Sequence, residues 1–187
     1  LSAVKLGQLI AEAGFPAGTV NIVTGFGKTA GAAIVEHSGV DKVSFTGSTV
    51  TGRSILRAAT GNLKRVTLEL GGKSPVVIFP DADLDKAIPS AAMGIFGNAG
   101  QVCAAGSRAF VHESVYDQVI EGVSRMAASL KVGAGLAPGT QMGPLVSQTQ
   151  LDRVLGYIES GRGEGATVGI GGARIEGEGY GGYFVQP

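Results

Sequence analysis

Short apolar segments alternate with helix-like segments through the first 70 residues, and this alternation limits the folds open to the chain. Residues 42–45 and 65–70 are rich in the apolar and β-branched residues typical of strands, and residues 49–59 between them have a helical pattern. Strands that are joined through a helix pair in parallel, because the crossover returns the chain to the same end of the sheet. We therefore expect an α/β fold with a parallel sheet.

The same patterns predict further elements on both sides of this unit. Helices are expected over residues 1–13, 28–36, 84–97 and 147–160, and strands over residues 19–23, 75–79 and 108–112. Ser114 is expected to cap a helix that runs to about Leu130. Residues 161–182 include ten glycines, which predicts a flexible or hairpin-like connection.

Composition excludes several classes of function. Fifteen Lys and Arg balance fifteen Asp and Glu, which argues against a nucleic-acid partner, because such proteins usually have a basic face. No apolar run approaches the ~18 residues of a membrane-spanning helix. The single cysteine fits a reducing compartment, so we expect a cytoplasmic protein. One cysteine and two scattered histidines do not have the spacing of metal ligands. The chain begins with Leu inside a helical pattern, which suggests a piece of a longer protein.

The first candidate site follows the strand that ends near Phe45. Gly47 would let the backbone approach a phosphate closely, and the free N–H groups of the next helix would attract the anion. Ser48 or Thr49 could add a hydroxyl donor. The spacing departs from the usual Gly-x-Gly-x-x-Gly signature, so an ordinary capped turn between strand and helix is the alternative.

The second candidate is Glu69, which precedes the glycine pair Gly71 and Gly72 at the end of a predicted strand. Ligands usually bind at strand ends in an α/β sheet. A glutamate between two leucines is expected to lose water, which suits a general base. The alternative is that Glu69 points outward or pairs with Lys73.

The third candidate is the lone Cys103, within the glycine-rich segment 96–108. Its small neighbours leave room for a carbonyl group beside the sulfur and leave its backbone N–H free to bind a developing oxyanion. A thiolate there would be a nucleophile. The alternative is a buried structural cysteine, since free cysteines are among the most buried residues.

In this order the three motifs resemble those of the NAD(P)-dependent aldehyde dehydrogenase superfamily. The match includes the Leu68–Pro75 glutamate signature, the Gly100–Cys103 cysteine signature and their separation of 34 residues between Glu69 and Cys103. The resemblance implies an aldehyde dehydrogenase-like α/β fold. Residues 1–71 would be the C-terminal part of a Rossmann-type coenzyme domain, and residues 72–187 the N-terminal part of an α/β catalytic domain.

The resemblance also implies roles for individual residues. Cys103 would attack the aldehyde to give a thiohemiacetal and then a thioester, and Glu69 would activate the water that hydrolyses the thioester. NAD or NADP would be the coenzyme, with NAD as the default. The substrate would be an aldehyde, and the parent protein would be a homo-oligomer. The coenzyme would contact Gly25, Gly27, Thr46, Gly47, Ser48, Gly71, Gln150 and Arg153.

Two other functions remain open at this point. A coenzyme A-acylating relative would pass the acyl group to CoA instead of water, although Glu69 argues against it. A non-catalytic nucleotide-binding or structural relative is the other alternative. We expect the isolated chain to be nearly inactive, because the family's second oxyanion donor is absent from it, and losing one such donor lowers the rate by about 10²–10³.

Overall fold

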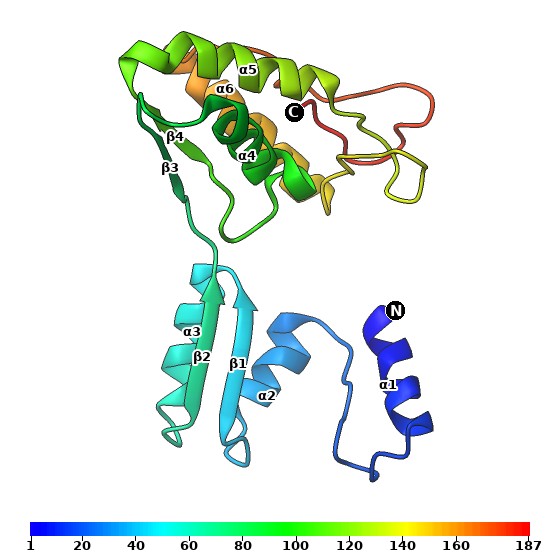
Figure 1. The fold of residues 1–187 in the computed structure, drawn as a ribbon. Helices are drawn as coiled ribbons and strands as arrows, with labels where there is room; N and C mark the ends of the chain where they lie inside the picture. The colour runs from blue at the N-terminus through cyan, green and yellow to red at the C-terminus, as the bar shows by residue number, and fades with distance from the viewer. The chain divides into compact units, whose positions relative to one another are not determined.

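The computed structural model describes all residues 1–187, and they divide into two compact units, Leu1–Leu70 and Gly71–Pro187. Each unit combines helices with a two-stranded parallel sheet, so the predicted α/β class is confirmed (Figure 1). The two units are described separately below. Whether their boundary also separates coenzyme and catalytic functions stays a prediction.

The first unit is organised around one strand–helix–strand crossover. β1 pairs in parallel with β2, in a register that places Phe45 beside Leu68 and Thr46 beside Glu69. The predicted parallel pairing is therefore confirmed. In chain order the elements are α1 (Ser2–Glu12), a π-helical turn (Gly27–Gly31), α2 (Ala32–Glu36), β1 (Lys42–Gly47), α3 (Thr49–Ala59) and β2 (Arg65–Leu70).

The crossover helix α3 covers one face of this sheet. Alternate residues of β2 are half-buried, and α3 buries Gly52, Ile55 and Ala59. A Cβ added at Gly52 would lie 2.9 Å from Leu70 Cδ2. Glycine therefore lets the helix pack directly on the leucine side chains of β2.

The strand predicted over residues 19–23 is wrong. The segment makes no ladder, and Val20, Ile22 and Val23 are exposed. Ile22 instead lies against α1, where a Cβ added at Gly7 would be 2.9 Å from Ile22 Cδ1. An apolar, β-branched run becomes a strand only when another strand lies beside it, and no strand pairs with this segment.

The second unit contains a second parallel pair, β3 and β4, and a pair of packed helices, α4 and α5 (Figure 1). Ile78, Val115 and Val119 form its first buried cluster. Leu145, Leu151 and Val185 form a second cluster. The elements are β3 (Pro75–Ile78), α4 (Leu84–Phe96), a 3₁₀ turn (Gly97–Gly100), β4 (Arg108–Val111), a 3₁₀ turn (Glu113–Val115), α5 (Tyr116–Ser129) and α6 (Gln148–Gly163).

Ser114 does not cap α5, contrary to prediction. A 3₁₀ turn precedes the helix, and the imidazole of His112 accepts a hydrogen bond from the Ser114 N–H at 3.3 Å. The Ser114 hydroxyl lies 2.9 Å from the same imidazole nitrogen. A histidine acceptor two residues upstream thus replaces the serine cap. The glycine-rich segment beyond α6 forms one antiparallel bridge, Arg174 to Val185, and no strand.

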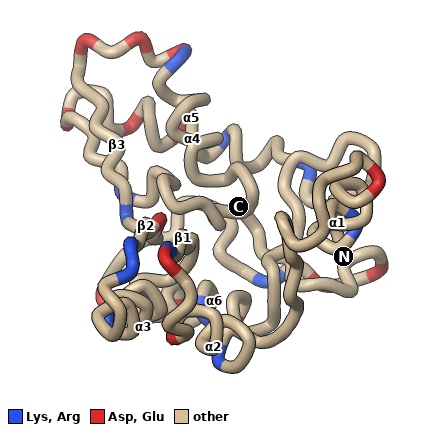
Figure 2. Tube along the Cα trace, turned by 90° about the horizontal axis from the view of Figure 1, so that it is seen from below, with Lys and Arg blue, Asp and Glu red and all other residues tan.

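Charged residues of both signs are interspersed along the chain (Figure 2). The ion pairs are exposed and join near neighbours in sequence, such as Lys86 with Asp83 and Arg125 with Glu121. Such pairs contribute little to stability. No helix has both the length and the apolar character needed to cross a bilayer.

One lysine of the first unit is buried. The Lys64 side chain donates hydrogen bonds to the carbonyl oxygens of Val35 and His37, at the C-terminal end of α2. The amide of Asn62 donates to Ser38 and Val40 in the loop that follows. A cation at a helix C-terminus is stabilised by the free carbonyl groups there. Residues 62–64 therefore connect α2 to the α3–β2 loop.

We expect Lys64→Met to lower the free energy of unfolding by about 1–3 kcal/mol, because it removes the two charge-assisted hydrogen bonds that the buried ammonium donates at the end of α2. Urea unfolding followed by circular dichroism measures the change. The exposed Lys42→Met is the matched control and should change stability by less than about 0.5 kcal/mol. Equal effects of the two substitutions would contradict this role of Lys64.

Candidate functional site

The turn between β1 and α3 has features of a phosphate-binding turn and also of an ordinary capped turn. Ser48 is the N-cap of α3, and its hydroxyl oxygen accepts a hydrogen bond from the Thr51 N–H at 3.2 Å. The Ser48 and Thr51 hydroxyl oxygens are also 2.9 Å apart. Thr46, Gly47 and Ser48 are all exposed, so the start of this 11-residue helix is open to an anion.

Close packing already favours a glycine at position 47. A Cβ added there would lie 2.5 Å from the tip of the Phe45 ring, which turns back over the end of the strand. The next glycine along α3, Gly52, is required by contact with Leu70. The glycine spacing of this motif therefore has a structural cause, whatever ligand the turn binds.

The glycines at positions 25 and 27 lie where the chain enters the π-helical turn. A Cβ added at Gly25 would lie 2.8 Å from the Ala30 Cβ, so this glycine allows the chain to approach the turn closely. Gly27 begins the turn, and no atom lies within 4 Å of where its Cβ would be. Of these two predicted coenzyme contacts, only Gly27 has open space at its Cβ position.

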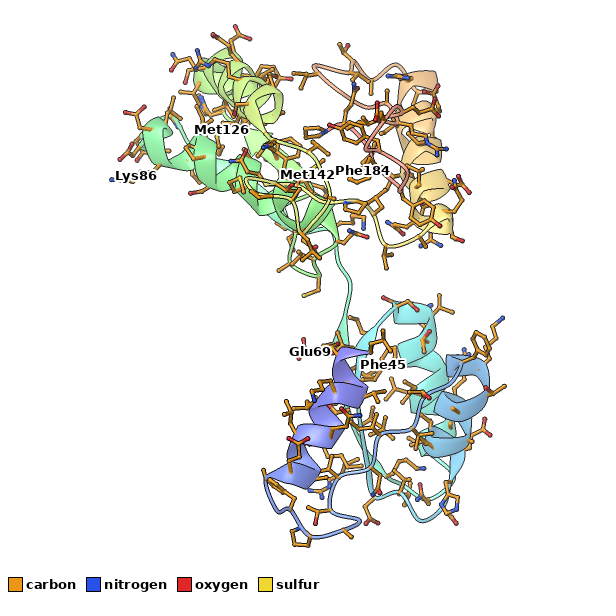
Figure 3. The ribbon with its side chains drawn as sticks, turned by 90° about the vertical axis from the view of Figure 1, so that its right-hand side faces the viewer. Phe45, Glu69, Lys86, Met126, Met142 and Phe184 are labelled. Carbon is orange, nitrogen blue, oxygen red and sulfur yellow. The ribbon has the colours of Figure 1, made fainter.

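Glu69 is exposed, and the predicted loss of water around it is wrong. Leu68 and Leu70 are half-buried on the opposite face of β2, because successive side chains of a strand point to opposite faces. Glu69 shares its own face with Thr46, its register partner on β1. Figure 3 shows Glu69 at the end of β2, where the chain leaves the sheet. Its carboxylate is thus hydrated and points outward.

In the second unit, Cys103 occupies an exposed turn. The Ala105 N–H donates to the Val102 carbonyl at 3.1 Å, which closes the turn around Cys103 and Ala104. The N–H of Cys103 makes no hydrogen bond within the chain. The alternative of a buried structural cysteine is therefore wrong, and both the thiol and the adjacent N–H are open to a ligand.

Contacts with β3 fix the C-terminal side of the cysteine turn. A Cβ added at Gly106 would lie 2.5 Å from Val76 Cγ2, so only glycine permits this approach. Arg108 donates from Nε to the Lys73 carbonyl at 2.9 Å and from its backbone N–H to the Ser74 carbonyl at 3.3 Å. The segment before β3 is thus held to the segment that follows the cysteine.

The glycine pair of the glutamate signature begins the second unit. A Cβ added at Gly72 would lie 3.6 Å from the Cys103 carbonyl oxygen. No atom lies within 4 Å of the corresponding position at Gly71. Gly72 therefore borders the cysteine turn, whereas the space beside Gly71 is open. The Lys73 ammonium donates to the Gly72 carbonyl at 3.1 Å.

Gln150 and Arg153 lie in the first turns of α6. Ser147 caps this helix, and its hydroxyl oxygen accepts a hydrogen bond from the Gln150 N–H at 3.2 Å. Leu151 is fully buried in the second cluster and fixes which face of the helix points inward. Gln150 is half-buried and Arg153 is exposed.

The sequence reasoning missed one residue of this region, Gln101. Its side-chain oxygen accepts a hydrogen bond from the Val146 N–H at 2.9 Å, across 45 residues of sequence. The only signal in the sequence is that Gln101 lies two residues before the lone cysteine. Such proximity does not reveal a partner so far along the chain.

The comparisons with known proteins agree on one family. The family model described as "Aldehyde dehydrogenase family" matches residues 1–187. The chain is 54% identical to the aldehyde dehydrogenase of Agaricus bisporus and 52% identical to a mitochondrial aldehyde dehydrogenase of Leishmania tarentolae. Each alignment covers 100% of this chain and 37% of the relative, so the chain spans little more than a third of the curated relatives' length.

A solved structure gives the same result for the fold. The NAD+ complex of an aldehyde dehydrogenase from Bacillus cereus matches with a TM-score of 0.96 and 55% sequence identity. The match covers 100% of this chain and 38% of the solved chain. The aldehyde dehydrogenase-like fold expected from the sequence is thereby confirmed for this part of the protein.

We expect Ser48→Ala to lower the free energy of unfolding by about 0.5–2 kcal/mol, because the N-cap of α3 is lost. Ser48→Asp should retain most of the stability, since a carboxylate also caps a helix. Urea unfolding of both variants measures the difference. Ser54→Ala, further along the same helix, is the control, and its change should be small because alanine favours helix. If Ser48→Asp is as unstable as Ser48→Ala, the capping role is wrong.

Proposed function

This chain belongs to the aldehyde dehydrogenase family, and from that premise we propose that the complete protein oxidises an aldehyde to a carboxylic acid with NAD or NADP. The observation that supports this most is the exposed turn at Cys103, where a thiol and an unused backbone N–H are presented together. A nucleophile beside an oxyanion donor is the arrangement that acyl-transfer chemistry requires.

The reaction begins at the Cys103 sulfur. The thiolate forms a C–S bond to the aldehyde carbon, and the carbonyl oxygen, which gains the negative charge, accepts a hydrogen bond from the Cys103 N–H. Protonation of that oxygen completes a thiohemiacetal. When bound, the oxidised nicotinamide coenzyme supplies the acceptor for the hydride that leaves this carbon, and loss of the hydroxyl proton then leaves a thioester on Cys103.

Hydrolysis of the thioester is assigned to Glu69. The carboxylate takes a proton from water while the water oxygen bonds to the acyl carbon, and the C–S bond breaks to release the acid and the Cys103 thiolate. The exposure of Glu69 supports this role only in leaving its carboxylate accessible to water, and it does not provide the loss of water expected from the sequence. The chain path also supports this role, since Gly72 lies only three residues beyond Glu69 and borders the cysteine turn.

The residues present are compatible with a dinucleotide. The open start of α3 at Ser48 suits the pyrophosphate, and the open space beside Gly27 and Gly71 leaves room for flat groups to approach. Thr46, Gly47 and Gly25 complete the proposed contacts of the first unit, and Gln150 and Arg153 those of the second. We accordingly assign residues 1–71 to the coenzyme domain and residues 72–187 to the catalytic domain.

Location and assembly are part of the proposal. The single cysteine supports a reducing compartment, and we place the protein in the cytoplasm, unlike the mitochondrial relative of Leishmania tarentolae. We propose a homo-oligomer for the complete protein. Val77 in β3, Phe110 in β4 and Phe79 just after β3 remain exposed, and burial of these apolar side chains by the rest of the protein or by a second copy is compatible with an assembly.

The test is Glu69→Gln in the full-length protein. We expect the first turnover to produce NADH at close to the normal rate and the steady-state rate to fall by about 10²–10⁴, because a general base contributes that factor to hydrolysis alone. Stopped-flow absorbance separates the two phases. Glu178→Gln, exposed in the glycine-rich segment, is the control and should leave both phases unchanged.

The outcome that contradicts the proposal is equally specific. If Glu69→Gln slows the first turnover and the steady state by the same factor, Glu69 does not act at the hydrolysis step. If its steady-state rate is normal, Glu69 is not the base.

A further inference from the structure

Gln101 uses both ends of its side-chain amide. Its oxygen accepts the Val146 N–H at 2.9 Å, and its nitrogen donates to the Asn98 carbonyl at 3.1 Å. The Asn98 amide returns a bond to the Gln101 carbonyl at 3.2 Å. An exchange of hydrogen bonds thus joins residues 98 and 101, and a single long-range bond joins them to residue 146.

The turn that presents Gln101 has an unusual backbone. Asn98 and Ala99 adopt φ values of 51° and 53°, a left-handed conformation that residues other than glycine seldom adopt. Such a conformation persists only where the surroundings hold it. Here the Asn98–Gln101 pair closes the turn, and Ala99 packs against the buried cluster that contains Leu151 of α6.

Val146 lies immediately before the start of α6. The preceding residue, Leu145, is buried and donates its N–H to the Tyr183 carbonyl at 2.9 Å. The following residue, Ser147, caps the helix that presents Gln150 and Arg153. A bond from Gln101 to this position therefore connects the cysteine turn, two residues downstream of Gln101, to the first turn of α6.

We propose that Gln101 is a positioning residue that fixes the Cys103 turn to the start of α6. In this proposal its side chain contacts neither the Cys103 sulfur nor the aldehyde carbon. Its function is to hold the nucleophile at a constant position relative to the helix whose side chains Gln150 and Arg153 are proposed to contact the coenzyme. This inference rests on the proposed function for its catalytic meaning, but the connection itself is a property of the second unit alone.

A glutamine suits this position better than its near relatives. The Val146 N–H needs an acceptor, and the Asn98 carbonyl, which already accepts the Gln101 backbone N–H at 3.1 Å, takes a second donor, so a side-chain amide makes both contacts. Methionine has similar length and flexibility but forms neither strong bond. Glutamate keeps the acceptor and loses the donor. Gln101→Met therefore removes both the long-range bond to Val146 and the local bond to Asn98, whereas Gln101→Glu removes only the local bond.

The first measurement is hydrogen exchange at the Val146 amide in the full-length protein. We expect Gln101→Met to raise its exchange rate about tenfold, because one hydrogen bond of ordinary strength is lost. Gln101→Glu should retain the protection. Gln148→Met is the matched control, since Gln148 is an exposed glutamine of α6 that bonds only to Asp152, at 2.6 Å. An unchanged exchange rate in Gln101→Met overturns the proposal.

The second measurement is the rate of Cys103 alkylation by iodoacetamide, with and without saturating NAD+. In the wild type we expect saturating NAD+ to change the alkylation rate. In Gln101→Met the change in rate caused by NAD+ should be smaller by about fivefold or more, because coupled sites influence each other reciprocally. The quantity compared is the ratio of the alkylation rates with and without NAD+. Gln101→Glu and Gln148→Met should keep the wild-type ratio. A general loss of stability would not change this ratio in protein that is still folded, which thermal unfolding verifies.

The two measurements distinguish the possible failures. If Gln101→Met keeps the wild-type coenzyme effect, Gln101 does not position the thiol, and the proposal is overturned. If the wild type itself shows no coenzyme effect, the proposed function is contradicted at its coenzyme step. In that case the exchange rate of Val146 still decides whether Gln101 holds the turn to α6.

Discussion

The chemistry proposed for this protein depends on how the turn at Cys103 is held. Val102, Cys103 and Ala104 are exposed, so packing around their side chains cannot fix the turn. Hydrogen bonds hold it from both sides, through Gln101 to Val146 on one side and through Arg108 to Lys73 on the other. An accessible nucleophile needs this support, because a catalytic group must stay within a narrow range of positions while remaining open to substrate.

The glycines of this chain differ in what surrounds them. At Gly47, Gly52 and Gly106, an added Cβ would meet Phe45, Leu70 or Val76, so these glycines allow elements to pack closely. No atom lies within 4 Å of where a Cβ would stand at Gly27 or Gly71, so packing does not require glycine at these two positions. Close packing therefore accounts for some glycines of these motifs and not for others.

Much of the fold could be predicted from local sequence, because strand and helix periodicity are local properties. The bounds of α3 and β2 agree with prediction, and so does their parallel crossover with β1. The errors arose where other partners decide: residues 19–23 pair with no strand and only Ile22 lies against α1, and His112 replaces the Ser114 cap. Glu69 was expected to be shielded by leucines that lie on the opposite face of its strand. The bond from Gln101 to Val146 had no local signal, and the roles of the site residues remain predictions.

The most direct test of the account is to find the acyl group itself. The full-length protein is mixed with NAD+ and an aldehyde, quenched in acid within one turnover, digested, and analysed by mass spectrometry. The account predicts that the mass of the acyl group appears on the peptide that contains Cys103, and that Glu69→Gln increases its amount. Turnover without any acylated Cys103 peptide, or with the acyl group on another residue, would contradict it.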